Sequence, residues 1–245
     1  MIAIILAGGE GTRLREVVSD VPKPMAPVAG KPFLEYLILQ LKQGGIREII
    51  LSTGYKRETV KAYFGTGERW GVRISYSEEE FPLGTGGALR KASVLPDAPD
   101  AGPVLVLNGD SFLSIDLRAL AAFHAGKNAR ATMGLVFLED TSRYGRVETD
   151  SAGQVIAFAE KSAGSPGRIN GGVYVFGRDI LASIPEGKVS LETEVLPLLV
   201  GRGLYGMETK GFFRDIGIPH DYRGLNEDPR ELAAALRLQG EGKTP

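Results

Sequence analysis

Short apolar runs alternate with amphipathic stretches through the first half of the chain, and this alternation restricts the fold more than any other feature. The strand-like runs are Ile2–Ala7, Glu48–Ser52, Val72–Tyr76 and Val104–Leu107. Apolar residues at helical spacing over 33–41, and further amphipathic stretches over 58–64 and 88–94, predict helices between these runs. Strands that alternate with helices predict a mostly parallel sheet covered by helices on both faces.

In open parallel sheets, ligands bind beyond the carboxyl ends of the strands. We therefore expect the chemistry in the loops after Ala7, Tyr76 and Leu107. The second half has shorter strand-like pieces separated by turns, which predicts a small β-rich extension of the sheet; these pieces are 130–138, 145–149, 154–159 and 172–176. The length suits one sizeable core, so we expect a single domain over 1–226, in two halves (1–127 and 128–226), and a C-terminal helix and tail over 227–245.

Composition excludes several classes of function. The chain has no cysteine, which rules out disulfides, zinc–thiolate sites and cysteine nucleophiles. No apolar run approaches the roughly 20 residues that span a bilayer, and a formal net charge of −1 lacks the basic character typical of nucleic-acid binding. We therefore expect a cytoplasmic protein with no membrane or nucleic-acid partner, which holds anionic ligands with locally placed lysines and arginines.

A glycine-rich loop follows the first strand. Gly8-Gly9-Glu10-Gly11-Thr12-Arg13-Leu14 is followed about ten residues later by Pro22-Lys23-Pro24-Met25. The three glycines let backbone N–H groups approach phosphate oxygens, and Arg13 and Lys23 add cations for a triphosphate. The glycine spacing and the lysine position differ from both the Walker loop and the dinucleotide-binding fingerprint. A glycine-rich turn with surface cations is the alternative, but it does not require the Pro-Lys-Pro element.

Two more segments have residues suited to ligand binding. Asp110 follows the apolar run 104–107, where it would face the ligand crevice and offer the hard oxygen that Mg²⁺ prefers beside phosphates; a turn with a solvated acid is the alternative. Gly84-Thr85-Gly86-Gly87 precedes the helix predicted at 88, where free N–H groups favour an acceptor or an anion. By itself this second segment is equally consistent with a flexible turn.

The glycine loop and the Pro-Lys-Pro-Met element together closely resemble the signature of the sugar-1-phosphate nucleotidyltransferases. The resemblance extends from about Ile2 to Tyr222, and 15–28 and 170–174 are most similar to the guanylyltransferases of D-glycero-α-D-manno-heptose 1-phosphate. It implies a Rossmann-like, GT-A-like fold and transfer of GMP from GTP to that sugar 1-phosphate, with Mg²⁺ and release of pyrophosphate. A mannose-1-phosphate guanylyltransferase, another NDP-hexose pyrophosphorylase and a non-catalytic sugar-nucleotide sensor are the alternatives. Relatives often form homodimers.

The same resemblance implies the site residues. The residues expected to bind the nucleotide all lie in the 1–127 half. They are Leu6, Ala7, Gly8, Gly9, Gly11, Thr12, Arg13, Lys23, Glu80, Gly84, Thr85, Gly86 and Asn108. The sugar phosphate falls mainly to the 128–226 half, at Gly109, Tyr144, Gly145, Glu160, Lys161, Asn170, Gly171 and Glu192. Arg13, Lys23, Asp110 and Lys161 are the catalytic set, and Asp110 and Asp215 are the metal ligands.

Some of these residues also have simpler interpretations. Glu80 is expected to accept hydrogen bonds from guanine N1 and N2, and Asp215 lies among apolar residues, where a carboxylate needs a cation such as a metal or Arg214. Without the family, Glu160-Lys161 is an ordinary surface pair and Glu192 is a first-turn acid after Ser190. We assign no chemistry to the remaining candidates, which are expected to be packing residues (His124, Trp70), surface (His220) or solvated charges (Arg143, Arg146).

Overall fold

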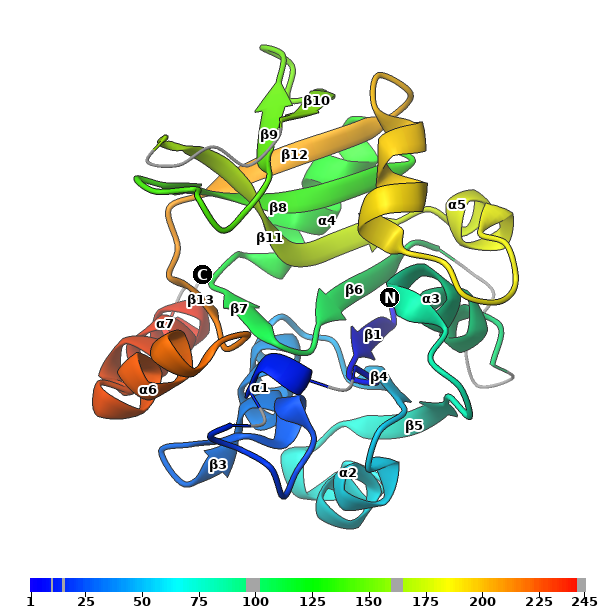
Figure 1. Cartoon of the computed structure of the whole chain (residues 1–245). Helices are drawn as coiled ribbons and strands as arrows, with labels where there is room; N and C mark the ends of the chain where they lie inside the picture. Colours follow the sequence, from blue (N-terminus) through cyan, green and yellow to red (C-terminus); the bar gives the residue numbers. More distant parts are fainter. Residues whose placement is uncertain (10, 15, 96–101, 160–164, 242–245) are drawn as a thin grey trace.

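The computed structural model describes residues 1–9, 11–14, 16–95, 102–159 and 165–241, and one nine-stranded sheet organises them (Figure 1). The strands of this sheet are β1 Ala3–Leu6, β4 Glu48–Thr53, β5 Arg73–Glu78, β6 Val104–Asn108, β8 Ala131–Leu138, β9 Arg146–Thr149, β10 Val155–Ala159, β11 Gly167–Phe176 and β12 Leu204–Thr209. Two small pairs lie outside it: β2 Pro27–Val28 with β3 Lys31–Pro32, and β7 Ser111–Leu113 with β13 Phe213–Asp215.

The sheet runs in the order β10-β9-β11-β6-β1-β4-β5, with β8 paired to β11 and β12. The four strands of the first half, β6, β1, β4 and β5, are parallel neighbours, as the alternating pattern predicts. The strands of the second half add antiparallel pairs through β11, and only β12 runs parallel to its neighbour β8. The expected mixed sheet with a β-rich extension is therefore confirmed.

Helices cover both faces of this sheet. They are α1 Phe33–Gln43, α2 Arg57–Phe64, α3 Gly84–Ser93, α4 Leu117–Gly126, α5 Arg178–Ser183, α6 Pro219–Glu227 and α7 Arg230–Glu241, with a π-helical turn over Leu191–Val195. Side chains alternate along β1: Ala3 and Ile5 join the core that contains α1, α2 and α7, whereas Ile2 and Ile4 join the core that contains α3 and α5. Successive strand residues point to opposite faces, so a strand buried on both sides is apolar throughout.

Two predicted boundaries were wrong. The third helix begins at Gly84, four residues earlier than predicted, so Gly84-Thr85-Gly86 forms its first turn instead of a preceding loop. The strand predicted over 172–176 begins at Gly167, so Asn170-Gly171-Gly172 lies within it. Its pairing with β8 shifts between Asn170 and Tyr174, and Gly172 has a positive φ of 76°. Glycine adopts that conformation readily, so the glycines mark an irregularity within a strand and do not mark its start.

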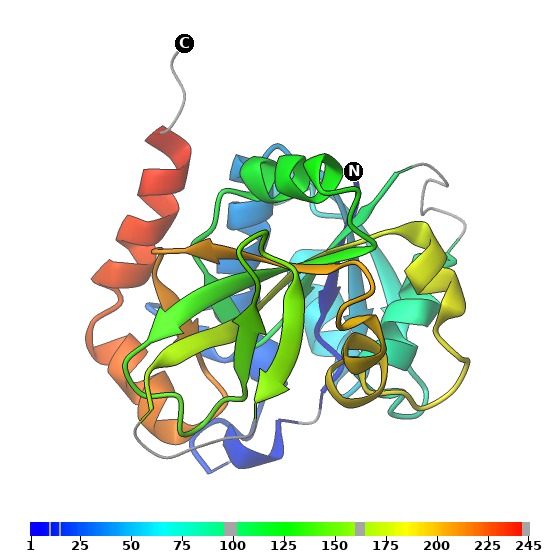
Figure 2. The same ribbon diagram turned by 90° about the horizontal axis from the view of Figure 1, so that it is seen from above.

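The end of the described chain returns to the first half. Residues 213–215 of β13 pair with 111–113 of β7, which lies directly after β6. Helices α6 and α7 then lie next to each other on the α1 side of the molecule, where α7 packs against the core that contains α1 (Figures 1 and 2). Within the described ranges, no helix combines the length and apolar character needed to cross a membrane.

Candidate functional site

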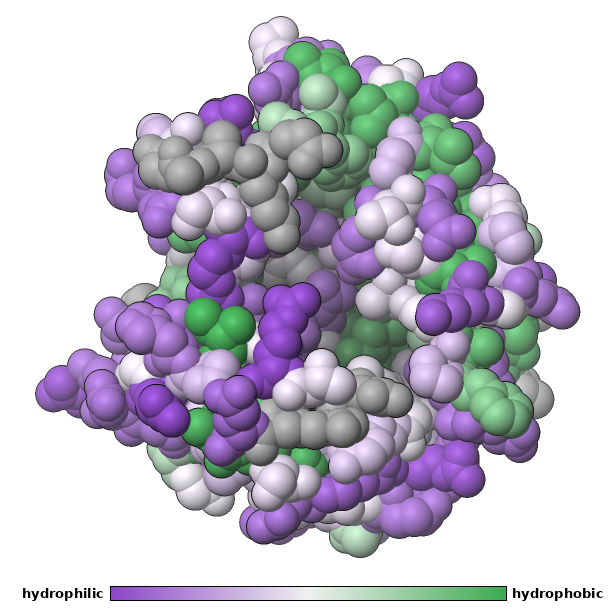
Figure 3. Space-filling model, in the orientation of Figure 1, coloured by the Kyte–Doolittle hydropathy of each residue, from purple (hydrophilic) through white to green (hydrophobic). Residues whose placement is uncertain are grey.

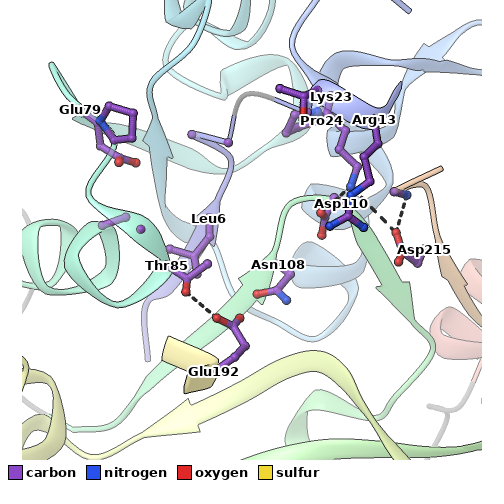
Figure 4. A pocket seen from close by; sticks show the side chains of 18 residues that line it. Leu6, Arg13, Lys23, Pro24, Glu79, Thr85, Asn108, Asp110, Glu192 and Asp215 are labelled. Carbon is purple, nitrogen blue, oxygen red and sulfur yellow. Dashed lines mark hydrogen bonds and ion pairs between the residues drawn. The ribbon is translucent and has the colours of Figure 1, made fainter. Parts of the chain in front are cut away.

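A pocket of about 480 Å³ lies at the carboxyl ends of β1, β5 and β6, where the sequence places the chemistry. Its volume is within the range of small-molecule sites. In Figure 3 the molecule is hollowed near the centre of the face shown, and hydrophilic residues gather along the left rim of the hollow. The lining residues are Leu6, Gly8, Gly9, Gly11, Thr12, Arg13, Lys23, Pro24, Glu79, Pro82, Gly84, Thr85, Ala88, Asn108, Asp110, Glu192, Asp215 and Gly217 (Figure 4).

The glycine loop forms one wall of this pocket because other groups pass close to its backbone. A Cβ on Gly8 would collide with the Glu79 carboxylate, and a Cβ on Gly11 would lie 2.7 Å from Lys23 Cβ. Gly11 also has a positive φ of 59°. The loop then enters a 3₁₀ turn over Thr12–Leu14, in which Leu14 is buried and Arg13 is exposed to the pocket. The glycines therefore bring backbone, an acid and two cations into one wall.

Lys23 lies between two carboxylates. Its Nζ is 2.6 Å from Asp110 Oδ2 and 4.0 Å from Asp215 Oδ1. The two aspartates are far apart in sequence, but Asp215 is in register with Ser111 in the β7–β13 pair, and Ile216 N donates to Asp110 O at 2.9 Å. The short β7–β13 pair thus brings the two acids together, and Lys23, from the 3₁₀ turn Lys23–Met25, meets them at the same end of the pocket (Figure 4).

Asp215 is surrounded by charged groups. Burial raises the pKa of Asp215, and the nearby charge of Asp110 raises it further, although Lys23 and Arg143 oppose this shift. Arg143 Nη2 lies 3.7 Å from Asp215 Oδ2, and Arg143 also forms an ion pair with Asp221 in the first turn of α6. Arg143 is exposed, as predicted for a solvated charge, but it is also paired with two carboxylates, which the sequence did not indicate. Arg146 was also predicted to be a solvated charge, but its Nε atom is buried.

Glu79 is the acid at the β5 side of the pocket. Its side chain is 9% exposed, and it accepts hydrogen bonds from Ser52 Oγ at 3.3 Å and Leu83 N at 3.0 Å. Burial raises the pKa of Glu79, an effect larger than the opposing hydrogen bonds. Glu80, which the sequence favoured, is exposed and is absent from the pocket lining. The structure therefore brings Glu79 into the site in place of Glu80.

The first turn of α3 contacts the segment before the π-helical turn. Gly86 N and Gly87 N donate to Val189 O at 2.9 and 3.2 Å, so these amides are not free for an anion, contrary to our expectation. Thr85 Oγ1 donates to Glu192 Oε2 at 2.6 Å and accepts from Leu191 N at 2.8 Å. Thr85 and Glu192 both line the pocket, on the side opposite the aspartates in Figure 4.

Of the expected acceptor-side residues that the structure describes, Glu192 lines the pocket, whereas Gly109, Tyr144, Gly145, Asn170 and Gly171 do not. Tyr144 packs edge-on against Phe213, with ring centroids 5.8 Å apart, and its pKa is raised to about 12 by burial and by the charge of Asp215. Asn170 Nδ2 donates to the buried Tyr174 hydroxyl at 2.7 Å, and its Oδ1 accepts from Gly172 N. Glu160 and Lys161 lie outside the described residues.

The structure thus brings together thirteen of the predicted site residues. Leu6, Gly8, Gly9, Gly11, Thr12, Arg13, Lys23, Gly84, Thr85, Asn108, Asp110, Glu192 and Asp215 all line the pocket. Among the described residues, the pocket lining does not include Ala7, Glu80, Gly86, Gly109, Tyr144, Gly145, Asn170 or Gly171. The roles assigned to all these residues remain predictions. The remaining expectations agree with the structure: His124 and Trp70 are buried at 6% exposure each, and the His220 side chain is 92% exposed.

Several residues in or next to the site were not singled out by the sequence. Buried side chains alternate at the end of β5, where Ser77 and Glu79 are both buried. Extending this alternation one residue past the strand would have favoured Glu79 over Glu80. Pro82, Ala88 and Gly217 carry no chemical signal, and Pro24 was named only as part of the Pro-Lys-Pro-Met element. Arg143 contributes through a pairing between distant segments, which no local pattern reveals.

Known proteins resemble this chain in sequence and in fold. Residues 2–231 match the model of the family described as nucleotidyl transferase. The chain is 45% identical to a D-glycero-α-D-manno-heptose 1-phosphate guanylyltransferase from Aneurinibacillus thermoaerophilus (93% of this chain and 98% of the relative). It is 40% identical to a mannose-1-phosphate guanylyltransferase from Mycobacterium tuberculosis (97% and 67%). It also resembles the crystal structure of HddC from Yersinia pseudotuberculosis complexed with GMP-PN, with a TM-score of 0.79 and 33% identity over 92% of this chain and 97% of that one. This chain therefore belongs to the nucleotidyl transferase family.

Proposed function

We propose that this protein transfers GMP from GTP to a sugar 1-phosphate, with D-glycero-α-D-manno-heptose 1-phosphate as the favoured acceptor. The observation that carries the proposal is the convergence of Lys23, Asp110 and Asp215 beside the glycine loop in one pocket. A heptose 1-phosphate guanylyltransferase at 45% identity supports the choice of base and sugar. The relative from Mycobacterium tuberculosis makes mannose 1-phosphate the second candidate.

The proposed reaction needs positioning and charge compensation more than proton transfer. An oxygen of the sugar 1-phosphate, already ionised at neutral pH, attacks the α-phosphorus of GTP in line. The bond from that phosphorus to the β-phosphate oxygen breaks, and pyrophosphate leaves. Because two polyanions must meet, the protein has to supply fixed positive groups around the transferred phosphoryl group. In this proposal the 1–127 half binds the nucleotide and the 128–226 half binds the sugar phosphate.

Arg13 and Lys23 are proposed to stabilise the β- and γ-phosphates as they leave. Both side chains reach the pocket from the segment after β1, next to a loop whose glycines leave room for phosphate oxygens close to the backbone. Lys161 is proposed to hold the attacking phosphate, on the evidence of the family resemblance alone. Charged donors of this kind form the stronger hydrogen bonds to phosphate.

Asp110 and Asp215 fit a divalent cation. Their proximity contributes to the raised pKa of Asp215, and the ammonium of Lys23 contacts both carboxylates, so the place between them favours positive charge. No group of three or more acidic or histidine side chains able to hold a metal occurs within the described ranges. That agrees with Mg²⁺, which typically takes one or two carboxylates and completes its shell with phosphate oxygens and water. When bound, it would offset negative charge on the reacting phosphates.

Glu79 is proposed to face the base in place of Glu80. It lies in the pocket wall at the end of β5, and its position is fixed by the hydrogen bonds from Ser52 and Leu83. A carboxylate has about four acceptor positions, so it retains capacity for the N1–H and N2–H groups of guanine, a donor pair that uracil lacks.

The proposal is tested by pyrophosphate release from a matrix of GTP, ATP, UTP and CTP against heptose, mannose, glucose and N-acetylglucosamine 1-phosphates. We expect the highest kcat/KM with GTP and heptose 1-phosphate. GTP with mannose 1-phosphate as the only productive pair would select the second candidate. Activity confined to glucose 1-phosphate with UTP or dTTP would contradict the proposal.

A further inference from the structure

We propose that Thr85 is a positioning residue for the acceptor sugar: its hydroxyl holds Glu192 in the pocket, and the glycines around it seat the segment that carries Glu192. The inference rests on the proposed function, because it assumes that a sugar 1-phosphate enters this pocket. It assigns to Gly84-Thr85-Gly86-Gly87 a role in packing the acceptor side, in place of the phosphate-binding role that such a motif suggests at the start of a helix.

The glycines are needed for close packing of the chain. A Cβ on Gly84 would lie 2.5 Å from Val189 O, and a Cβ on Gly87 would collide with Gly187 O. The same carbonyl of Val189 accepts hydrogen bonds from Gly86 N and Gly87 N, and Val189 N donates to Leu83 O at 2.9 Å. Two amides at this helix start, those of Gly86 and Gly87, are therefore hydrogen-bonded to Val189, three residues before Glu192.

The Thr85 hydroxyl connects this packing to the pocket. It accepts from Leu191 N at 2.8 Å and donates its single proton to Glu192 Oε2 at 2.6 Å. Ser190 Oγ reaches the same oxygen at 3.4 Å. Both of these hydrogen bonds end on Oε2, and none from the described residues reaches Oε1, which is therefore the oxygen that we assign to a ligand in the pocket. With its only proton donated to Glu192, the Thr85 hydroxyl is poorly placed to donate to a nucleotide as well.

The chemistry of Glu192 suits a sugar better than a phosphate. A carboxylate repels phosphate groups and accepts hydrogen bonds from hydroxyls. In Figure 4, Asn108 lies between Glu192 and the group of Lys23, Asp110 and Asp215 where phosphates are expected. Glu192 also lies close enough to the Tyr174 hydroxyl for its charge to contribute to the raised pKa of that tyrosine, and Tyr174 binds Asn170 on the acceptor side.

The test compares two affinities in the same enzyme. Thr85→Val keeps the shape of the side chain and removes the hydroxyl. We expect the KM for the sugar 1-phosphate to rise about tenfold, a loss typical of a hydrogen bond to a charged group, with kcat changed less than about threefold. The Kd of GTP, measured by calorimetry in the absence of the sugar, should stay within about twofold. Thr85→Ser should restore the KM, and Thr66→Val, at an exposed threonine outside the pocket, is the matched control.

A double-mutant cycle shows whether the two residues act as a unit. Glu192→Ala should raise the sugar KM at least as much, and adding Thr85→Val to it should change KM by less than about twofold. Additive effects, or a weaker GTP affinity in place of a raised sugar KM, would overturn the inference. Circular dichroism shows whether Thr85→Val folds. If it does not, Glu192→Ala alone is used, because the Glu192 side chain is exposed and its removal should not disturb folding. A rise in the Kd of GTP in Glu192→Ala would then refute the role on the acceptor side. A wild-type enzyme inactive throughout the substrate matrix would instead refute the proposed function.

Discussion

The Nζ atom of Lys23 contacts two carboxylates, Asp110 at 2.6 Å and Asp215 at 4.0 Å, in a side chain that is only 13% exposed. Without a cation between them, the two like charges would repel at close range. Lys23 therefore occupies the place that a divalent ion fits, and the same ammonium is within the pocket that we propose for the triphosphate. This arrangement links the metal ligands to the phosphate-binding wall.

Lys23→Ala is expected to lower kcat on the order of 10²–10³-fold, comparable with the loss of a preorganised donor to a developing negative charge. The measurement is pyrophosphate release at saturating GTP and sugar 1-phosphate. Lys210→Ala, at an exposed lysine outside the pocket, is the control and should retain activity. A Lys23→Ala enzyme with near-normal turnover would contradict the proposed role.

Glu79→Gln is expected to reduce the preference for GTP over ATP, on the order of tenfold or more in kcat/KM, because an amide presents an N–H₂ group to the donors of guanine. Glu80→Gln is the matched control and should leave the preference unchanged, since its side chain is exposed. The reverse pattern, with only Glu80→Gln losing the preference, would restore the original assignment.

The same residue predicts a pH dependence. Burial raises the pKa of Glu79 above its ordinary value of 4.5. The folded chain therefore holds this proton more tightly than the unfolded chain, so the associated stabilisation is present at low pH and is lost as pH rises through the raised pKa. The ionised form can accept from guanine with both oxygens, whereas protonation turns one of them into a donor, so GTP affinity should fall as pH drops through that pKa. Calorimetric Kd values against pH should show this limb in the wild type and lose it in Glu79→Gln.

The sequence predicts the parts of the site that depend on local pattern. The parallel strands follow from apolar runs, and the glycine loop, Lys23 and Asp110 follow those strands directly, so their meeting at one edge of the sheet is a consequence of topology. The start of α3 was misplaced because glycine has poor helix propensity, while the hydrogen bonds of Gly86 and Gly87 to Val189 stabilise that turn. Tertiary contacts overrode the local preference there.

The rest of the site depends on long-range pairing. Asp215 reaches Asp110 through the β7–β13 pair, and the sequence suggested this only by family resemblance. Arg143 reaches Asp215 and Asp221 from the loop between β8 and β9, and an arginine in a polar loop carries no sign of such a contact. Glu79 and Glu80 are neighbours, and a shift of one residue along a strand moves a side chain to the opposite face of the sheet. The sequence prediction was wrong by this one residue.

Arg143→Ala is expected to weaken Mg²⁺ activation about tenfold. Removing the guanidinium takes a cation away from Asp215 and breaks the ion pair between the β8–β9 loop and Asp221 of α6. The Asp215 carboxylate therefore loses charge compensation and a fixed orientation. Arg143→Lys should recover only part of the loss, because a lysine ammonium lacks the planar set of N–H donors with which the guanidinium reaches Asp215 and Asp221 from separate nitrogens. The measurement is the Mg²⁺ concentration for half-maximal activity, with Arg230→Ala, at an 88% exposed arginine, as the control. An unchanged Mg²⁺ requirement would show that Asp215 does not need Arg143.

Tyr174→Phe is expected to destabilise the fold by about 1–3 kcal/mol, since it removes a wholly buried hydroxyl and leaves the Asn170 amide without its acceptor. Phenylalanine fills the same space and keeps the stack on Phe176, so packing is retained and the lost hydrogen bond accounts for the change. Urea unfolding of the two proteins at one pH measures the difference. Tyr205→Phe, at a half-buried tyrosine on β12, is the control and should change stability by less than about 0.5 kcal/mol. A Tyr174→Phe protein as stable as the wild type would show that the Asn170 amide finds another acceptor. The hydrogen bond between Asn170 and Tyr174 would then not be what stabilises this part of β11.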